Sequence, residues 1–106
     1  MFPGGMGNMM KQIQKMQKQI LEAQERIAGM EVEATAGGGV VKVVVSGRKE
    51  LKSVTLAPEV VDPDDIETLQ DLIVAAVNEG MHKAEEMAAR EMEKITGGMP
   101  RIPGLF

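Results

Sequence analysis

The sequence predicts an α+β fold in which a helix, a three-stranded antiparallel meander and a long C-terminal helix follow one another. Apolar residues recur every three or four positions from residue 6 to 30, alternate with polar residues from residue 31, and recur every 3.6 positions from residue 66 to 95. Spacings near 3.5 indicate helices, and alternation indicates strands. The changes of period therefore divide the chain into a helix, a sheet and a second helix.

The first helix is predicted from Asn8, a suitable N-cap, to Ala28, with Gly29 closing it. Its mean apolar step of about 3.4 residues is closer to the 3.5 repeat of a supercoiled seam than to a straight helix. The seam consists of Met6, Met9, Ile13, Met16, Ile20, Ala23, Ile27 and Met30.

Three short strands are predicted next, and Gly-rich turns connect them. Residues 31–36 alternate charged or polar with apolar, Val40–Val45 is nearly all valine, and Leu51–Leu56 follows a turn at residues 46–49. The run Gly37-Gly38-Gly39 has no Lys-Ser or Lys-Thr after it, so we interpret it as a hairpin turn and not as a phosphate-binding loop. Valine on both sides of the second strand predicts that this strand is central and covered on more than one face.

The last helix is predicted from Pro63 to Thr96. Asp62 is a good N-cap, and proline suits the first helical position. We expect residues 8–96 to form a single domain, with loose tails rich in Gly, Pro and Met at residues 1–7 and 97–106. The apolar stripe of this helix consists of Ile66, Leu69, Ile73, Val77, Met81, Ala84, Ala88, Met92 and Ile95.

The composition excludes several classes of function. The 106 residues include no Cys, Trp or Tyr, which removes disulfides, thiolate metal sites, cysteine nucleophiles and most base-stacking platforms. No apolar run approaches the ~20 residues of a membrane span, and the N-terminus does not resemble a signal peptide, so a cytoplasmic protein is expected. The lone His82, with Glu86 four residues on, provides too few ligands for a metal. We therefore expect neither an enzyme nor a cofactor.

The helix lengths indicate a homodimer. The predicted helices would span ~31 Å and ~51 Å at 1.5 Å per residue. A six-residue strand spans only ~20 Å. Both helices must therefore extend past the sheet with Met and Ile still on their surfaces, and a second subunit would cover these side chains.

Charge is distributed unevenly along the chain. Residues 1–53 hold eight basic and five acidic side chains, whereas residues 54–106 hold four and eleven. Lys11, Lys15 and Lys18 share one face of the first helix, away from the seam, and no acid precedes Glu22. A solvated helix face is the common explanation for such a stripe, but unpaired lysines near the positive end of a helix dipole also suit phosphate contacts.

The basic residues of the last helix have acidic neighbours. Lys83 and Arg90 each follow a glutamate by four residues, a spacing that forms surface ion pairs. We therefore predict a mainly structural role for these two residues and freer side chains for Lys94 and for Arg101 in the C-terminal tail.

Taken together, several segments resemble the YbaB/EbfC family of bacterial nucleoid-associated proteins. The resemblance covers essentially the whole chain. The matching segments are residues 7–12 (GNMMKQ), 38–43 (GGVVKV), 51–54 (LKSV), 58–65 (PEVVDPDD), 71–78 (DLIVAAVN) and 104–106 (GLF).

The resemblance implies a tweezer-like homodimer that binds double-stranded DNA in the nucleoid through its first and last helices and that can influence gene expression and nucleoid organisation. It favours Lys11, Lys15 and Lys18 as contacts, and Lys83, Arg90 and Lys94 as a second set. No recognition-helix motif for base edges is visible, so we expect mainly phosphate contacts. The alternative hypothesis is a protein-binding adaptor that captures partners with its Met-rich helix ends, including Met6, Met9 and Met10, and with its flexible Gly/Pro tails.

Overall fold

The computed structural model describes the backbone of residues 3–96 and the side chains of residues 7–95. It confirms the predicted order of a helix, three antiparallel strands and a long helix. The predicted tail at residues 97–106 lies outside the described residues. The elements are α1 (Pro3–Ala28), β1 (Glu31–Ala36), the 3-10 turn η1 (Gly37–Gly39), β2 (Val41–Ser46), β3 (Leu51–Leu56), the 3-10 turn η2 (Pro58–Val60) and α2 (Ile66–Thr96).

The sheet has the order β1-β2-β3, so β2 is the central strand, as predicted. Val43 of β2 pairs with Ala34 of β1 and with Val54 of β3. Side chains at paired positions share a face, and this face is turned to α2. The expectation of cover on both faces of β2 is not met within the described chain, because Lys42 and Val44 on the other face are only half-buried.

Small residues allow α2 to lie close to the sheet. The core consists of valines of β2 against Ala76 and Ala84 of α2, with Ala34 from β1. Gly80 is buried between them, and a Cβ atom placed there would lie 2.8 Å from the Cγ2 atom of Val45. A larger residue at this position would push the helix away from the sheet.

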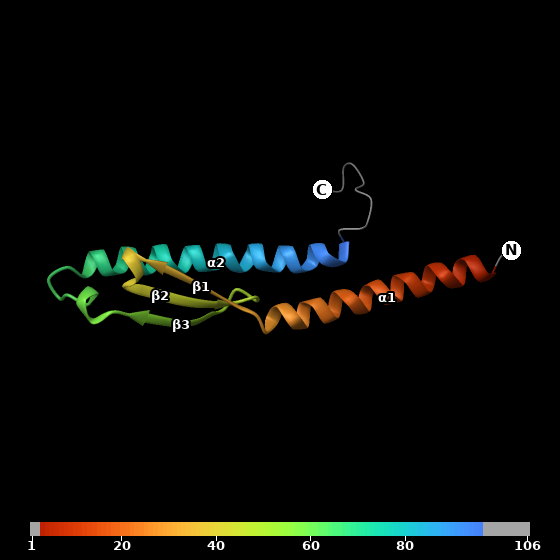
Figure 1. Cartoon of the computed structure of the whole chain (residues 1–106), viewed down its shortest axis with the longest axis horizontal. Coiled ribbons are helices and arrows are strands. Elements are labelled where there is room, and N and C mark those ends of the chain that lie inside the picture. Colours follow the sequence, from red (N-terminus) through yellow and green to blue (C-terminus); the bar gives the residue numbers. More distant parts are fainter. Residues whose placement is uncertain (1–2, 97–106) are drawn as a thin grey trace, which may run out of the picture.

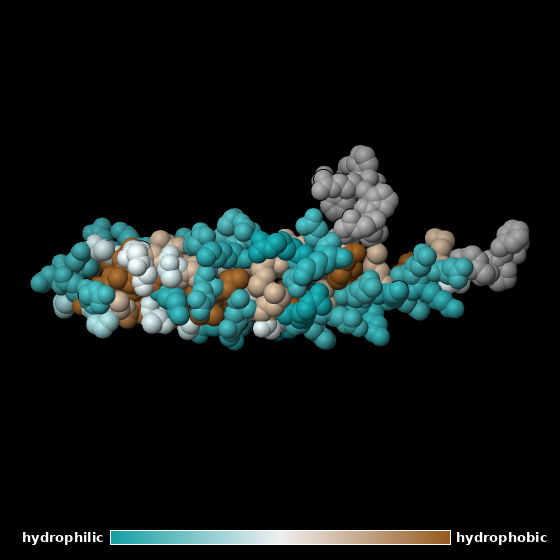
Figure 2. All heavy atoms as spheres, viewed as in Figure 1, coloured by the Kyte–Doolittle hydropathy of each residue, from teal (hydrophilic) through white to brown (hydrophobic). Residues whose placement is uncertain are grey.

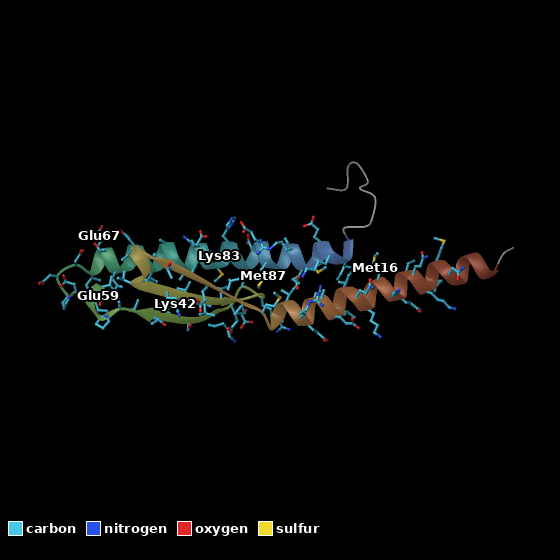
Figure 3. The ribbon with its side chains drawn as sticks, viewed as in Figure 1. Met16, Lys42, Glu59, Glu67, Lys83 and Met87 are labelled. Atoms are coloured by element: carbon cyan, nitrogen blue, oxygen red, sulfur yellow. The ribbon has the colours of Figure 1, made fainter. Side chains whose placement is uncertain are left out.

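The face of α2 that meets the sheet differs from the predicted stripe. At about 100° per residue, the line through Ala76, Gly80 and Ala84 is rotated by roughly 50° from the centre of the predicted stripe. The predicted stripe included Ala84 but otherwise followed mainly bulky residues, and it omitted Ala76 and Gly80, which pack against the sheet. Val77 and Met81, which belong to the predicted stripe, are therefore only half-buried. Met87, which the stripe omitted, is buried and lies on the inner side of α2 (Figure 3).

Both predicted helix starts were wrong. The first helix begins at Pro3 and not at Asn8, since proline fits the first turn, where its missing N–H is not needed. Residues 3–7 are therefore helical and not a loose tail. The last helix begins at Ile66, because the carboxylate of Asp65 accepts a hydrogen bond from the Thr68 N–H at 3.3 Å, as an N-cap does. Asp62 instead accepts from the Asp64 N–H at 2.9 Å in the preceding turn.

The second strand is also displaced by one residue and ends at Ser46. The hydroxyl of Ser46 accepts hydrogen bonds from the N–H groups of Arg48 and Glu50, both at 3.2 Å, and so organises the β2–β3 turn. This turn holds the end of α1. Gly47 donates to the Met30 carbonyl at 2.9 Å, and a Cβ atom at Gly47 would lie only 1.9 Å from the Ile27 carbonyl oxygen.

The subunit is a long rod of 78 × 28 × 15 Å. Figure 1 shows α2 lying along the sheet and continuing past it, with the C-terminal part of α1 beside the far end of α2. The N-terminal part of α1 then extends beyond every other described element. We call residues 7–18 of α1 the arm. The predicted extension of both helices past the sheet is therefore confirmed.

Candidate nucleic-acid interface

The arm carries the three lysines that the sequence singled out. Lys11, Lys15 and Lys18 are exposed and lie within about 60° of one another around α1 at 100° per residue. We call them the lysine face. The structure shows no ion pair or side-chain hydrogen bond for any of the three among residues 3–96. The absence of acidic residues from the first turn of α1 leaves this face positively charged.

The second set of predicted contacts is arranged differently, because each of these side chains has a partner. Lys83 donates to the main-chain carbonyl of Glu33 on β1 at 3.1 Å, and not to Glu79 as its spacing predicted. Arg90 lies 3.9 Å from the carboxylate of Glu86, which confirms that ion pair. Figure 3 shows Lys83 on α2 beside the sheet, far from the arm.

The prediction that Lys94 is freer than Lys83 and Arg90 was wrong, and Arg101 lies outside the described residues. Its ammonium contacts the carboxylate of Glu91, one turn earlier on α2. The same carboxylate accepts a hydrogen bond from Nε of Arg26 on α1 at 3.2 Å. The side chain of Glu91 is only 8% exposed, and the hydrogen bonds from Lys94 and Arg26 hold the pKa of this carboxyl group below its usual value. This cluster joins α1 to α2.

Sequence reasoning missed Arg26 and Glu91. Arg26 follows Lys18 by eight residues and lies on the same side of α1 as the lysine face. The spacing between Lys18 and Arg26 can be read from the sequence. No pattern in the sequence, however, indicates that Glu91, which follows Arg26 by 65 residues and lies on the other helix, is its partner. The pair links α1 to α2 on the side of α1 that carries the lysine face.

The opposite side of α1 is apolar. Met9 is 63% exposed and Ile13 is 53% exposed, while Met16 is half-buried. Met16 lies where α1 passes the end of α2 (Figure 3). At about 100° per residue, these three side chains point roughly 180° away from the lysine face. We call them the arm seam. The predicted seam residue Met6 lies outside the described side chains.

A second apolar surface lies beside the sheet. Because α2 packs mainly against β1 and β2, β3 is left largely uncovered on the face it turns to α2. Leu51 and Val54 of β3 are exposed, as is Val74 of α2 at 58%. At about 100° per residue, Val74 lies on the side of α2 opposite Lys83, which reaches β1. We call Leu51, Val54, Val74, Val77 and Met81 the apolar flank.

The two ends of the molecule therefore differ in surface chemistry. Figure 2 shows hydrophobic residues on the surface at the sheet end of the rod, whereas hydrophilic residues cover most of the arm in this view. A groove of about 490 Å³ lies between α1, the β2–β3 turn and α2, and its lining includes Leu21, Ile27 and Arg48. It is open to solvent and its lining has no group of acids or histidines.

The described residues contain no cluster of three or more His, Cys, Asp and Glu that could hold a metal ion. His82 contacts Glu86 at 2.9 Å on the exposed side of α2, as a surface pair. No described helix is both long and apolar enough to cross a membrane. Among the described residues, the surfaces that stand out are the lysine face and the exposed apolar side chains of the arm seam and the apolar flank.

Comparisons with known proteins agree with this description. The model of the YbaB/EbfC DNA-binding family matches residues 2–99. A nucleoid-associated protein of Alkaliphilus metalliredigens is 59% identical over 110 residues, covering 99% of this chain and 96% of its own. One of Acetivibrio thermocellus is 57% identical over 105 residues, covering 99% and 93%. One of Desulforamulus reducens is 56% identical over 106 residues and covers both chains fully.

A solved structure shows the same fold. An uncharacterized protein from Helicobacter pylori superposes with a TM-score of 0.71 at 23% identity, covering 92% of this chain and 99% of its own. The family match and the relatives confirm the resemblance noted in the sequence, and a DNA-binding family agrees with the prediction that the chain is not an enzyme. With 98 of the 106 residues matched by the family model, the chain belongs to the YbaB/EbfC DNA-binding family.

Proposed function

We propose that the protein is a nucleoid-associated homodimer that binds duplex DNA through the phosphates, with Lys11, Lys15 and Lys18 as the principal contacts. The observation that carries this proposal is the lysine face, three exposed ammonium groups without described partners on an arm that extends from the body. A cation already paired with a carboxylate must give up that pair to bind a phosphate, whereas these three lose only water and counterions.

The second set of cations contributes less in this proposal. Lys83, Arg90 and Lys94 are each held by a carbonyl or a carboxylate, and acidic side chains surround them on α2. Phosphates would meet those acids as well as the cations. We therefore propose that these three residues act as secondary contacts, after the arm lysines are engaged.

The apolar flank supports the dimer. A stable interface of standard size buries about 800 Å² on each partner, which is close to a tenth of the 7912 Å² of accessible surface in this subunit. The flank would form the apolar centre of such an interface. Two subunits joined at the sheet end would each present one arm, so six arm lysines would be available to one duplex.

Six lysines set a quantitative expectation. If they neutralise about six phosphates, the logarithm of the binding constant falls with the logarithm of the salt concentration at a slope of roughly −5. The net charge of −4 opposes nonspecific attraction to DNA over longer distances. Binding should therefore be modest in strength and strongly dependent on salt.

A charge-matched pair of variants tests the location of the interface. One replaces Lys11, Lys15 and Lys18 with glutamine. The other replaces Arg48, Lys49 and Lys52, which lie in the β2–β3 turn and at the start of β3, and so removes the same three charges. Duplex affinity is measured at low salt by fluorescence anisotropy of labelled DNA. We expect the arm variant to lose binding and the turn variant to keep most of it, and equal losses would show that only net charge matters.

A further inference from the structure

The arm has two chemically different faces, and the proposed function uses only one of them. If the lysine face lies against DNA, the arm seam of Met9, Ile13 and Met16 points away from the duplex, because it lies on the opposite side of the helix. An apolar stripe exposed on a DNA-bound protein would be placed to contact another protein. The seam therefore needs its own explanation.

The seam continues a line that already packs against a helix. Ala23 and Ile27 belong to the same stripe of α1, and both are buried where α1 runs beside α2. The seam continues toward the N-terminus past the described end of α2 at Thr96. From Ile13 to Met9, the described chain places no second helix beside it. The sequence thus maintains a helix-packing surface over a stretch where the described residues of its own subunit supply no partner helix.

We propose that the arm seam binds the arm seam of a second copy of this chain when DNA holds two copies next to each other. The spacing of four and three residues is that of a helix-pairing seam, and two identical seams present apolar side chains to each other. The lysine faces do not oppose this contact. They lie on the outer sides of the paired helices, each about 10 Å wide, where DNA neutralises them.

The size of the seam explains why DNA is needed. Three side chains from each arm make a small contact, and association of free molecules must also offset the loss of translational and rotational freedom. Two copies bound to neighbouring sites on one duplex meet at an effective concentration that reaches the millimolar range, so a weak contact can form. The arm contact would then make DNA binding cooperative. This consequence depends on the proposed function, whereas the contact between arms does not.

Disulfide trapping tests the contact, because the chain has no cysteine of its own. Ile13→Cys places a single thiol in the seam. The matched control is Gln14→Cys, one residue along the same exposed arm and about 100° around the helix. Each purified variant is treated with a mild oxidant, diamide, over a range of duplex concentrations at low salt. Covalent dimers are then counted on a non-reducing gel.

We expect DNA to raise the crosslinking rate of the Ile13→Cys protein at least about fivefold above that of the control. The excess should disappear when a large surplus of duplex spreads the copies over separate molecules. As a second measurement, Ile13→Gln should retain the affinity of the first binding event and lose cooperativity in a titration of a long duplex. Equal crosslinking of the two cysteine variants, with and without DNA, would overturn the proposal.

Failure of the DNA proposal would give a different pattern. If neither variant binds duplex, both are oxidised as concentrated free protein, where the contact can form without a template. Faster crosslinking of the Ile13→Cys protein than of the Gln14→Cys protein in that experiment supports the arm contact and shows that the contact forms without DNA. Equal rates there, too, would contradict the contact itself.

Discussion

The close approach of α2 to the sheet predicts that Gly80 and Val45 are energetically coupled. In Gly80→Ala, the new Cβ atom would lie 2.8 Å from one methyl group of Val45 and 3.0 Å from one of Val43. Alanine gains about 1 kcal/mol over glycine in a helix. Overpacking of a tight core costs about 1–3 kcal/mol. We expect a net loss of about 1 kcal/mol in the free energy of unfolding.

The coupling appears when Val45 is shortened. Val45 is fully buried, and Val45→Ala alone should cost about 2–3 kcal/mol, since it removes two buried carbons and leaves a cavity. In the double variant, the new methyl group at Gly80 occupies part of that cavity. The double variant should therefore lose about 1–2 kcal/mol less than the sum of the single variants.

The assay is urea unfolding followed by circular dichroism at a fixed protein concentration, because the chain has no Trp or Tyr to report by fluorescence and a dimer's stability depends on concentration. Gly7→Ala is a control, since its Cβ atom would meet nothing within 4 Å. It should not lose stability. Additivity of the Gly80 and Val45 effects to within about 0.5 kcal/mol would refute the packing argument.

Other features give further predictions. Asp65→Ala should lower the free energy of unfolding by about 1 kcal/mol by removing the N-cap of α2, and Asp65→Asn should restore most of the loss in the same urea assay. Val54→Glu or Val74→Glu should yield folded monomers by light scattering, whereas Val61→Glu, exposed outside the apolar flank, should remain dimeric. The free energy of unfolding should fall as the pH drops from about 5. The pKa of Glu91 is lowered in the folded chain, so the unfolded chain binds a proton at this carboxyl group at a higher pH, and acid therefore favours unfolding. Glu91→Gln should flatten that fall, and an unchanged pH profile would contradict the role of Glu91.

The sequence was sufficient for the fold because its periodicity changes cleanly between elements. The alternation through residues 31–36 and the dense valines of β2 predicted a meander with β2 at its centre, and the structure confirms it. The face of α2 was harder to predict, because apolar periodicity weights bulky residues. Close packing over Gly80 also brings Ala76, which the predicted stripe omitted, against the sheet, and only the distance between helix and sheet shows this.

The sequence predicted the part of the site that depends on residues close together in the chain. The lysine face depends on spacing within one helix, and the structure places all three lysines together on the arm. The ion pair between Arg26 and Glu91 and the contact between Lys83 and the Glu33 carbonyl join residues 65 and 50 positions apart. No pattern in a single sequence indicates such long-range pairs, so the second set of cations was described incompletely.

The salt dependence of duplex binding tests the central claim most directly. The wild-type protein should show a log–log slope of roughly −5, and each Lys→Gln substitution on the lysine face should reduce its magnitude by about 2, because a dimer loses two phosphate contacts. Replacing all three lysines should leave a slope near zero while the dimer stays intact. An unchanged slope in the triple variant would contradict the assignment of DNA binding to the arm.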